Sequence, residues 1–296
     1  MGVLYSVMVM VPVLLAMAFF TLMERKILGY IQIRKGPNKV GYAGVLQPFL
    51  DAAKLLSKEM ASPMYSSWGF FVAPGLALAL ALLMWVNYYS GGSVHLGHGA
   101  LFFLCVSSLS VYPVFMAGWA SNSKYALLGA VRSVAQTISY EVTMVLIILM
   151  PLCLFMVYDF LKMPSIPWGF LLFPPIMVMW VVTSLAETNR APFDFAEGES
   201  ELVSGFNIEY GGAGFALIFM GEYVSIIFLS FLTSILFLGS YLLWVKVGAI
   251  TFCFVWVRGA LPRLRYDLLM GLTWKCYLPV TLSVLVPECI LVYSLS

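Results

Sequence analysis

Six of the chain's 14 acidic residues fall within a window of 28 residues that runs from Glu187 to Gly214. Only 10% of the chain is charged, and long apolar runs flank the window on both sides. The window contains Glu187, Asp194, Glu197, Glu199, Glu201 and Glu209, with Arg190 as its one basic residue. Carboxylates between two membrane spans are costly, so such a cluster indicates a function. We expect the window to move protons in response to a molecule that binds beside it.

Neighbouring carboxyl groups interact strongly enough to share protons near neutral pH. Two carboxylates ~6 Å apart at an effective dielectric constant of ~20 repel by about 3 kcal/mol, which corresponds to about two pKa units. A string of such groups can therefore bind and pass protons. The competing interpretation is a solvated acidic loop, but Phe193, Phe195, Val203 and Phe206 are unusual in a loop that faces water.

A second set of polar residues interrupts the apolar stretch from Lys124 to Tyr158. In a helix one face would hold Arg132, Gln136, Ser139 and Thr143, and the opposite face would hold Thr137 and Glu141. Glu141 would lie about 25 Å along this helix, and Glu222 about 10 Å into a later span. Buried carboxyl groups of this kind usually face cavities or relays, and the alternative is a purely structural hydrogen bond.

The sequence lacks the side chains that hold a redox centre. Its only histidines are His95 and His98, and its five cysteines show no CxxC spacing. Iron–sulfur clusters and zinc sites need clustered cysteine or histidine ligands. We therefore predict no catalytic redox group, no metal site and no bound cofactor in this chain, and no nucleic-acid partner. Such a chain serves a redox reaction only by binding a substrate that a neighbour reduces.

The elements that position these residues must be membrane helices. The chain is 62% hydrophobic with a mean hydropathy of +0.95, well above a soluble domain. We predict an all-α integral membrane protein that forms a single polytopic domain over residues 1–296. Its eight spans would be approximately 3–23, 66–89, 100–120, 124–158, 168–190, 214–238, 241–258 and 274–294. Short amphipathic helices would lie at the interface, the clearest of them over residues 46–59.

The charge distribution orients these spans. Eight spans place both termini on one side of the membrane. Fourteen of the 16 basic residues then fall on the opposite side, with Lys162 and Lys246 as the exceptions. By the positive-inside rule the basic side is the cytoplasm or the mitochondrial matrix. Both termini are thus expected on the outer side, which is the intermembrane space in a mitochondrion.

Four segments that follow one another along nearly the whole chain resemble the NADH dehydrogenase subunit 1 family, in its mitochondrially encoded form. The members of this family are the quinone-site membrane subunits of respiratory complex I. The segments are ERKILGYIQIRKGPNKVG (24–41), WASNSKYALLGAVRSVAQTISYE (119–141), LAETNRAPFDFAEGESELVSGFNIEY (185–210) and LPRLRYDLL (261–269).

The resemblance implies that the first internal loop and the acidic window close the mouth of a quinone tunnel. It places Arg25 and Arg34 at that tunnel, and we assign Phe206 to the same quinone-binding set. It also implies an acidic channel made of Glu24, Asp51, Glu141, Glu187, Asp194, Glu197, Glu199, Glu201 and Glu222, with Arg190 and Arg265 paired to these acids.

The function implied by the resemblance is that of a core membrane subunit of proton-pumping NADH:ubiquinone oxidoreductase. Ubiquinone would be the substrate, and NADH, FMN and iron–sulfur clusters would bind to other subunits. The partners would be the other membrane subunits of complex I, the quinone-site subunits of its soluble arm, and phospholipid. The location would be the mitochondrial inner membrane.

Two other functions compete with this one. A stand-alone proton-coupled secondary transporter usually shows two related halves with broken helices in matching positions. The acids of this chain instead gather in one window, and no matched halves are visible. A passive scaffold for other membrane subunits would leave Glu141 and Glu222 unexplained.

Overall fold

The computed structural model describes residues 2–60, 67–88, 96–165, 167, 174–195, 198 and 205–295. Every regular element in these ranges is a helix, so the predicted all-α class is confirmed. Seven helices are long and apolar enough to cross a membrane. An eighth, α8 (Pro174–Glu187), is apolar and has 14 residues in the described part of the chain. The beginning expected for this span, at residue 168, lies outside the described residues.

The remaining helices follow one another with short connections. The first half of the chain forms α1 (Gly2–Ile31), α2 (Gln47–Ser57), α3 (Trp68–Met84), α4 (Gly99–Leu109), α5 (Val111–Ala120) and α6 (Lys124–Phe155). The second half forms α10 (Gly212–Thr233), α11 (Leu243–Ala260), α12 (Tyr266–Leu272) and α13 (Leu278–Leu295). A π-helical turn, Ser234–Leu238, extends α10, and another, Thr273–Tyr277, joins α12 to α13.

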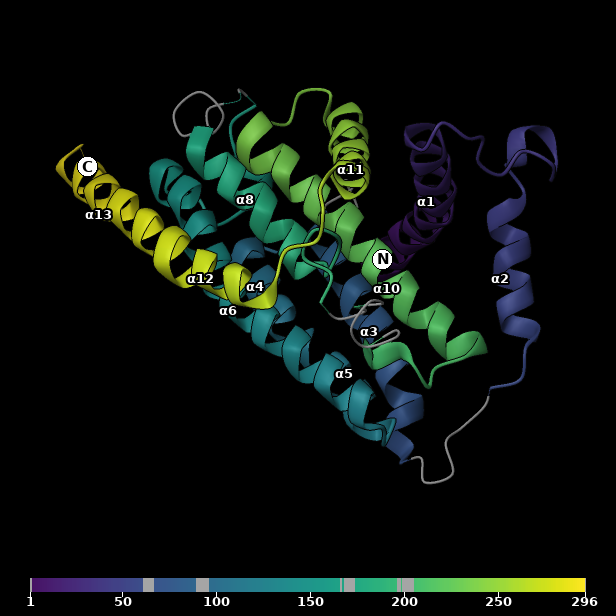
Figure 1. Ribbon diagram of the computed structural model, residues 1–296. Helices are drawn as coiled ribbons and strands as arrows, with labels where there is room; N and C mark the ends of the chain where they lie inside the picture. Colours follow the sequence, from purple (N-terminus) through teal and green to yellow (C-terminus); the bar gives the residue numbers. More distant parts are fainter. Residues whose placement is uncertain are drawn as a thin grey trace.

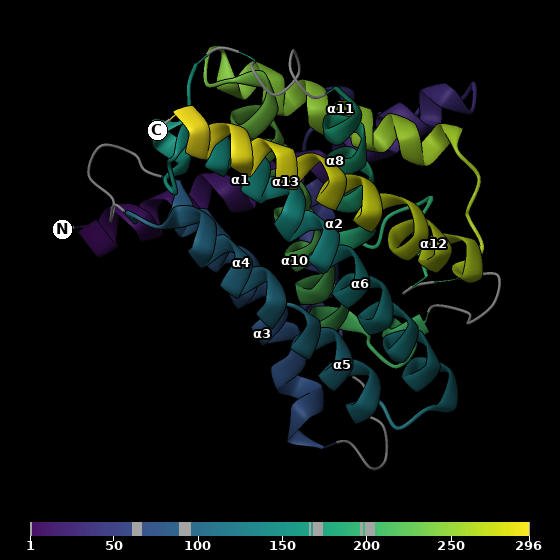
Figure 2. The same cartoon turned by 90° about the vertical axis from the view of Figure 1, so that its left-hand side faces the viewer.

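Two helices differ from the expected boundaries for identifiable reasons. The first helix was expected to end at the charged residues after Met23, but α1 continues to Ile31. Its charged residues remain helical because Glu24 and Arg25 find partners on other helices. The span expected over 100–120 consists of α4 and α5, which meet at Ser110 (Figure 2). The Ser110 hydroxyl donates to the Ser107 carbonyl at 2.6 Å at this junction.

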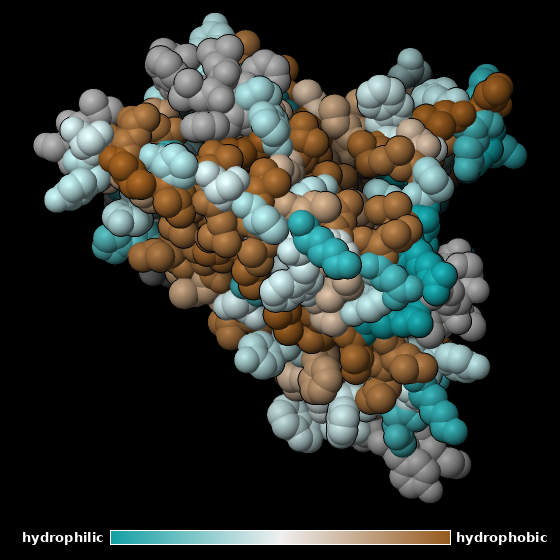
Figure 3. Space-filling model, turned by 60° about the vertical axis from the view of Figure 1, so that its left-hand side comes forward, coloured by the Kyte–Doolittle hydropathy of each residue, from teal (hydrophilic) through white to brown (hydrophobic). Residues whose placement is uncertain are grey.

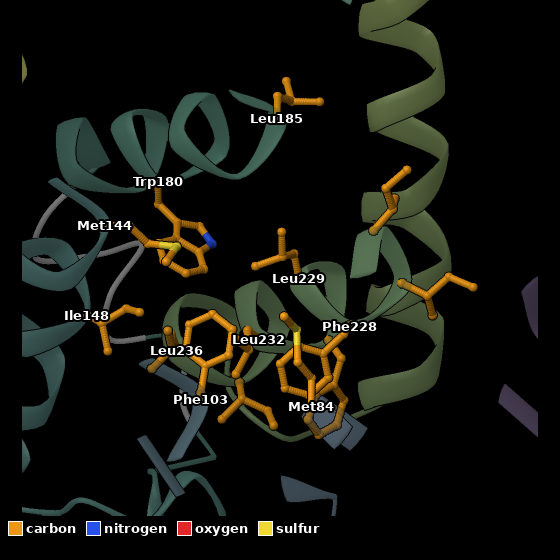
Figure 4. Packing of buried hydrophobic residues seen from close by; sticks show 14 of the residues in the cluster. Met84, Phe103, Met144, Ile148, Trp180, Leu185, Phe228, Leu229, Leu232 and Leu236 are labelled. Atoms are coloured by element: carbon orange, nitrogen blue, oxygen red, sulfur yellow. The ribbon is translucent and has the colours of Figure 1, made fainter. Parts of the chain in front are cut away.

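The hydrophobic core forms around α10. This helix packs against α3, α11, α1 and α2, and it runs through the middle of the molecule in Figure 1. Figure 4 shows side chains from several helices directed into one cluster: Trp180 from α8, Met144 and Ile148 from α6, Phe103 from α4, and Phe228, Leu229 and Leu232 from α10. Dense packing of this kind transmits small displacements between helices.

The outer surface is largely apolar. Hydrophobic side chains cover much of the face seen in Figure 3, and hydrophilic side chains gather in a few clusters. Large apolar residues such as Val7, Met8 and Ile290 are more than half exposed. An apolar surface of this extent suits lipid and neighbouring membrane proteins, because a soluble protein would bury most of it.

The two ends of the chain lie on opposite edges of the molecule. Helices α12 and α13 run along one edge beside α6, while α1 and α2 lie at the other edge (Figure 1). Because α1 and α2 both contact α10, the three helices enclose a space on that edge. The functional residues lie between this space and the interior of the molecule.

Candidate functional site

A cavity of about 310 Å³ lies between α1, α2 and α10. We call it the α1–α2 cavity. It is lined mostly by apolar side chains, including Met17, Leu55 and Phe219, with Arg25, Asp51 and Tyr223 as its charged or aromatic polar groups. This combination of an apolar wall, a suitable volume and a few polar groups is typical of a small-molecule site.

The cationic group of the α1–α2 cavity is Arg25. Its guanidinium donates to the Asp51 carboxylate at 2.5 Å, and the Gln47 amide donates to the other Asp51 oxygen at 2.9 Å. The Arg25 side chain is 54% exposed and that of Asp51 is 33% exposed. A pair this exposed stabilises the fold weakly. Arg25 therefore remains available to a ligand in the cavity.

Glu24 directs its side chain to a different part of the molecule, because consecutive residues of a helix lie about 100° apart. It is only 6% exposed. One carboxylate oxygen accepts a hydrogen bond from the Tyr223 hydroxyl of α10 at 2.6 Å, and the other pairs with Arg258 of α11. Tyr223 also lines the α1–α2 cavity, so a wall of that cavity is bonded directly to a buried acid.

A second buried ion pair lies on the other side of Tyr223. The Arg190 guanidinium contacts the Glu222 carboxylate at 3.2 Å and lies 4.5 Å from the centre of the Tyr223 ring. We call Glu24, Arg190, Glu222, Tyr223 and Arg258 the buried cluster. It combines two acids with two bases, so its charges balance, as burial away from water requires.

A second cavity, of about 90 Å³, continues inward from the buried cluster. We call it the acidic cavity, because Glu187 and Glu222 both line it, together with Thr137 and Asn189. One carboxylate oxygen of Glu187 and the side-chain oxygen of Asn189 are buried without a hydrogen-bond partner among the described residues. The cavity has room for water molecules beside these oxygens. Glu141 of α6 interacts electrostatically with Glu187 from the neighbouring helix.

Not all of the expected residues meet at these cavities. Arg34 is exposed, donates to Gln32 at 2.9 Å and does not line the α1–α2 cavity. Phe206 is buried and lines the acidic cavity instead. Asp194 is half-buried in the turn that follows α8, outside the lining of either cavity. Glu197, Glu199 and Glu201 lie outside the described residues.

Arg265 also departs from the expected arrangement. It pairs with Asp267 at 3.0 Å, and both side chains are exposed. The neighbouring base, Arg263, faces the acidic window instead, with its guanidinium 4.7 Å from the centre of the Phe195 ring. The alternation of bases before α12 explains this difference, because residues two apart in extended chain point the same way only when the backbone does not turn.

Sequence reasoning missed two members of the buried cluster. Tyr223 was overlooked because an aromatic residue in an apolar span looks like packing, although it directly follows Glu222. Arg258 was counted as a loop base, whereas it lies within α11 and pairs with Glu24 across 234 residues of sequence. A base placed two residues before the end of an apolar helix was the available signal.

Other chemistry finds little support in the described part of the chain. There, no group of three or more histidine, cysteine or acidic side chains is arranged to hold a metal ion. All five cysteines are free. Tyr210 is buried and stacks on Phe70 with ring centres 4.2 Å apart, and burial raises the pKa of its hydroxyl. Tyr210 is therefore a neutral packing residue at physiological pH.

Comparisons with known proteins identify the family. The family described as NADH dehydrogenase matches residues 4–288. "NADH-ubiquinone oxidoreductase chain 1" of Aedes aegypti is 52% identical over 289 residues, which cover 95% of this chain and 92% of that protein. The proteins of the same name from Anopheles gambiae and Heterololigo bleekeri are 50% and 51% identical, and each alignment covers 96% of this chain. The alignments cover 94% and 95% of those two proteins. The chain therefore belongs to the NADH dehydrogenase subunit 1 family.

Proposed function

We propose that the chain binds ubiquinone in the α1–α2 cavity and couples its reduction to proton movement through the buried cluster. The observation that carries this proposal is the position of Tyr223. Its ring lines the cavity, and its hydroxyl is bonded at 2.6 Å to Glu24, the first acid of the buried cluster. A chemical change in the cavity is thus one hydrogen bond away from the acids.

Family membership supplies the wider setting. The chain is a core membrane subunit of complex I, part of an oxidoreductase complex and a multi-pass protein of the mitochondrial inner membrane. We infer that it contacts other membrane subunits, the quinone-site subunits of the soluble arm, and phospholipid. The electrons would come from NADH through FMN and iron–sulfur clusters on those other subunits. This chain would contribute the binding site and the proton path.

Each part of the α1–α2 cavity suits one part of a quinone. The apolar wall formed by residues such as Met17 and Leu55 accommodates an isoprenoid tail. The Arg25 guanidinium can donate a hydrogen bond to a quinone oxygen and stabilise the negative charge that develops on it during reduction. Reduction to the quinol takes up two electrons and two protons, so proton donors must be near.

The buried cluster is suited to detect that negative charge. A new unit charge about 6 Å from a carboxylate raises the energy of the carboxylate by about 3 kcal/mol at an effective dielectric constant of ~20. Protonation of Glu24 would relieve this repulsion and weaken its pair with Arg258. The balance of charge around Arg190 and Glu222 would then change, because Arg190 lies against the Tyr223 ring. The acidic cavity receives the change through Glu222 and Glu187.

Substitution of Arg25 tests the binding site. In the assembled complex we expect Arg25→Ala to raise the KM for a short-chain ubiquinone by about tenfold, because a charge-assisted hydrogen bond to the quinone is lost. Lys54→Ala is the matched control, since Lys54 is an exposed base on α2 that does not line the cavity. The measurement is steady-state NADH:ubiquinone reductase kinetics on purified complex. An unchanged KM for Arg25→Ala, or an equal change for Lys54→Ala, would remove the quinone from this cavity.

A further inference from the structure

A single buried amide on α6 contacts both ends of the turn that carries the functional residues. The Nε2 atom of Gln136 donates to the carbonyl oxygen of Ala186 at 2.8 Å and to that of Phe193 at 2.9 Å. Gln136 is fully buried, with no exposed surface. One side chain thus joins α6 to the last turn of α8 and to the chain beyond Pro192.

The turn between these two carbonyls contains the charged groups of the proposed path. It begins with Glu187, which lines the acidic cavity, and includes Arg190, which pairs with Glu222. Its backbone is irregular, because Asn189 adopts a left-handed conformation with φ of 50°. Irregular backbone inside a membrane protein depends on side chains for its hydrogen bonds. Gln136 supplies two of these bonds.

Further contacts show that α6 supports the window over three helical turns. Gly129 allows a close approach, because a Cβ atom there would lie 2.9 Å from the Cα of Gly205. The Tyr140 ring, one turn beyond Gln136, lies 6.0 Å from the Phe193 ring. Helices α6 and α8 are packed together, and both views of the ribbon place them side by side (Figures 1 and 2). Gln136 is the polar contact on this apolar supporting face.

We propose that Gln136 is a positioning residue that sets the Glu187–Pro192 turn and thereby the approach of Arg190 to Glu222. The inference rests on the proposed function, since it assumes that this turn takes part in proton coupling. Gln136 itself touches neither the α1–α2 cavity nor the ions of the buried cluster. Its role is to fix the backbone from which Glu187 and Arg190 project.

The test is Gln136→Met in the assembled complex, a substitution that keeps the length of the side chain and removes both donors. We expect the kcat of coupled ubiquinone reduction to fall on the order of tenfold, because a misplaced relay group slows transfer. The KM for ubiquinone is expected to remain unchanged, because the α1–α2 cavity is not altered. Thr143→Val is the matched control: its buried hydroxyl bonds at 2.8 Å only to Tyr140 of the same helix. This control is expected to keep the wild-type kcat.

Gln136→Glu keeps the test decisive if the methionine variant does not assemble. The introduced carboxyl can donate a hydrogen bond to one carbonyl only when it is protonated. We therefore expect the kcat of Gln136→Glu, divided by that of the wild type, to rise as the pH falls. A ratio that does not change with pH, or a wild-type kcat in Gln136→Met, would overturn the inference.

A parallel measurement on Glu187→Gln separates this inference from the proposed function. If Glu187→Gln slows coupled turnover while Gln136→Met does not, the positioning role of Gln136 is wrong and the proposed function stands. If both variants turn over at the wild-type rate with the wild-type yield of protons, the proposed function itself is wrong. If both are slow and Thr143→Val is normal, Gln136 positions the turn.

Discussion

Glu187→Gln is expected to lower the rate of coupled ubiquinone reduction and proton translocation on the order of 100-fold, the upper range for the loss of a proton-transfer group being larger still. The complex should still assemble. One oxygen of Glu187 is buried without a hydrogen-bond partner among the described residues, and no ion pair joins this carboxyl to a base there. Removing its charge therefore leaves no base without its partner, and the fold has no reason to suffer.

The effect is measured as proton uptake and quinol formation in proteoliposomes that contain the purified complex. Glu209→Gln is the matched control, because Glu209 belongs to the same acidic window but lines neither cavity. We expect this control to retain most of the wild-type rate. Equal rates in Glu187→Gln and Glu209→Gln would mean that the acidic cavity is not on the proton path.

Arg258→Met is expected to cost about 3–5 kcal/mol of stability, because it leaves Glu24 as a buried acid without its base. The expected result is a lower yield of assembled complex and a lower temperature of inactivation. The exposed pair between Arg25 and Asp51 gives the contrast, since such pairs contribute about 0–1 kcal/mol. Asp51→Asn should therefore leave the temperature of inactivation almost unchanged.

A double substitution distinguishes loss of the pair from loss of packing. In Glu24→Gln combined with Arg258→Met, both charges are gone, and the glutamine can still accept a hydrogen bond from Tyr223. We expect the double variant to recover most of the lost stability while coupling remains impaired. If the double variant is as unstable as Arg258→Met alone, the burial of an uncompensated charge is not the cause.

The sequence predicted the helical class and most spans because apolar runs of about 20 residues have few alternatives. It also predicted the interfacial helix α2 from the spacing of its apolar residues. It did not predict the extension of α1 to Ile31, because the partners that make Glu24 and Arg25 acceptable in a helix lie on α2, α10 and α11. Local patterns cannot contain that information.

The site shows the same division between local and distant information. The importance of Glu24, Glu187 and Glu222 could be predicted from each residue alone, because an acid in an apolar stretch is unusual. The pairing of Arg258 with Glu24 could not be predicted in this way, since it depends on how α1 and α11 pack. The choice of Arg263 over Arg265 to face Phe195 depends on how the chain turns before α12.

The most direct test of the account is the yield of translocated protons per electron in a complex that carries Tyr223→Phe. The substitution keeps the ring beside the α1–α2 cavity and beneath Arg190, and it removes only the hydroxyl that donates to Glu24 at 2.6 Å. We predict a KM for ubiquinone close to that of the wild type and a clearly reduced proton yield. A wild-type proton yield at a wild-type rate of turnover would contradict the claim that this hydrogen bond connects the cavity to the buried acids.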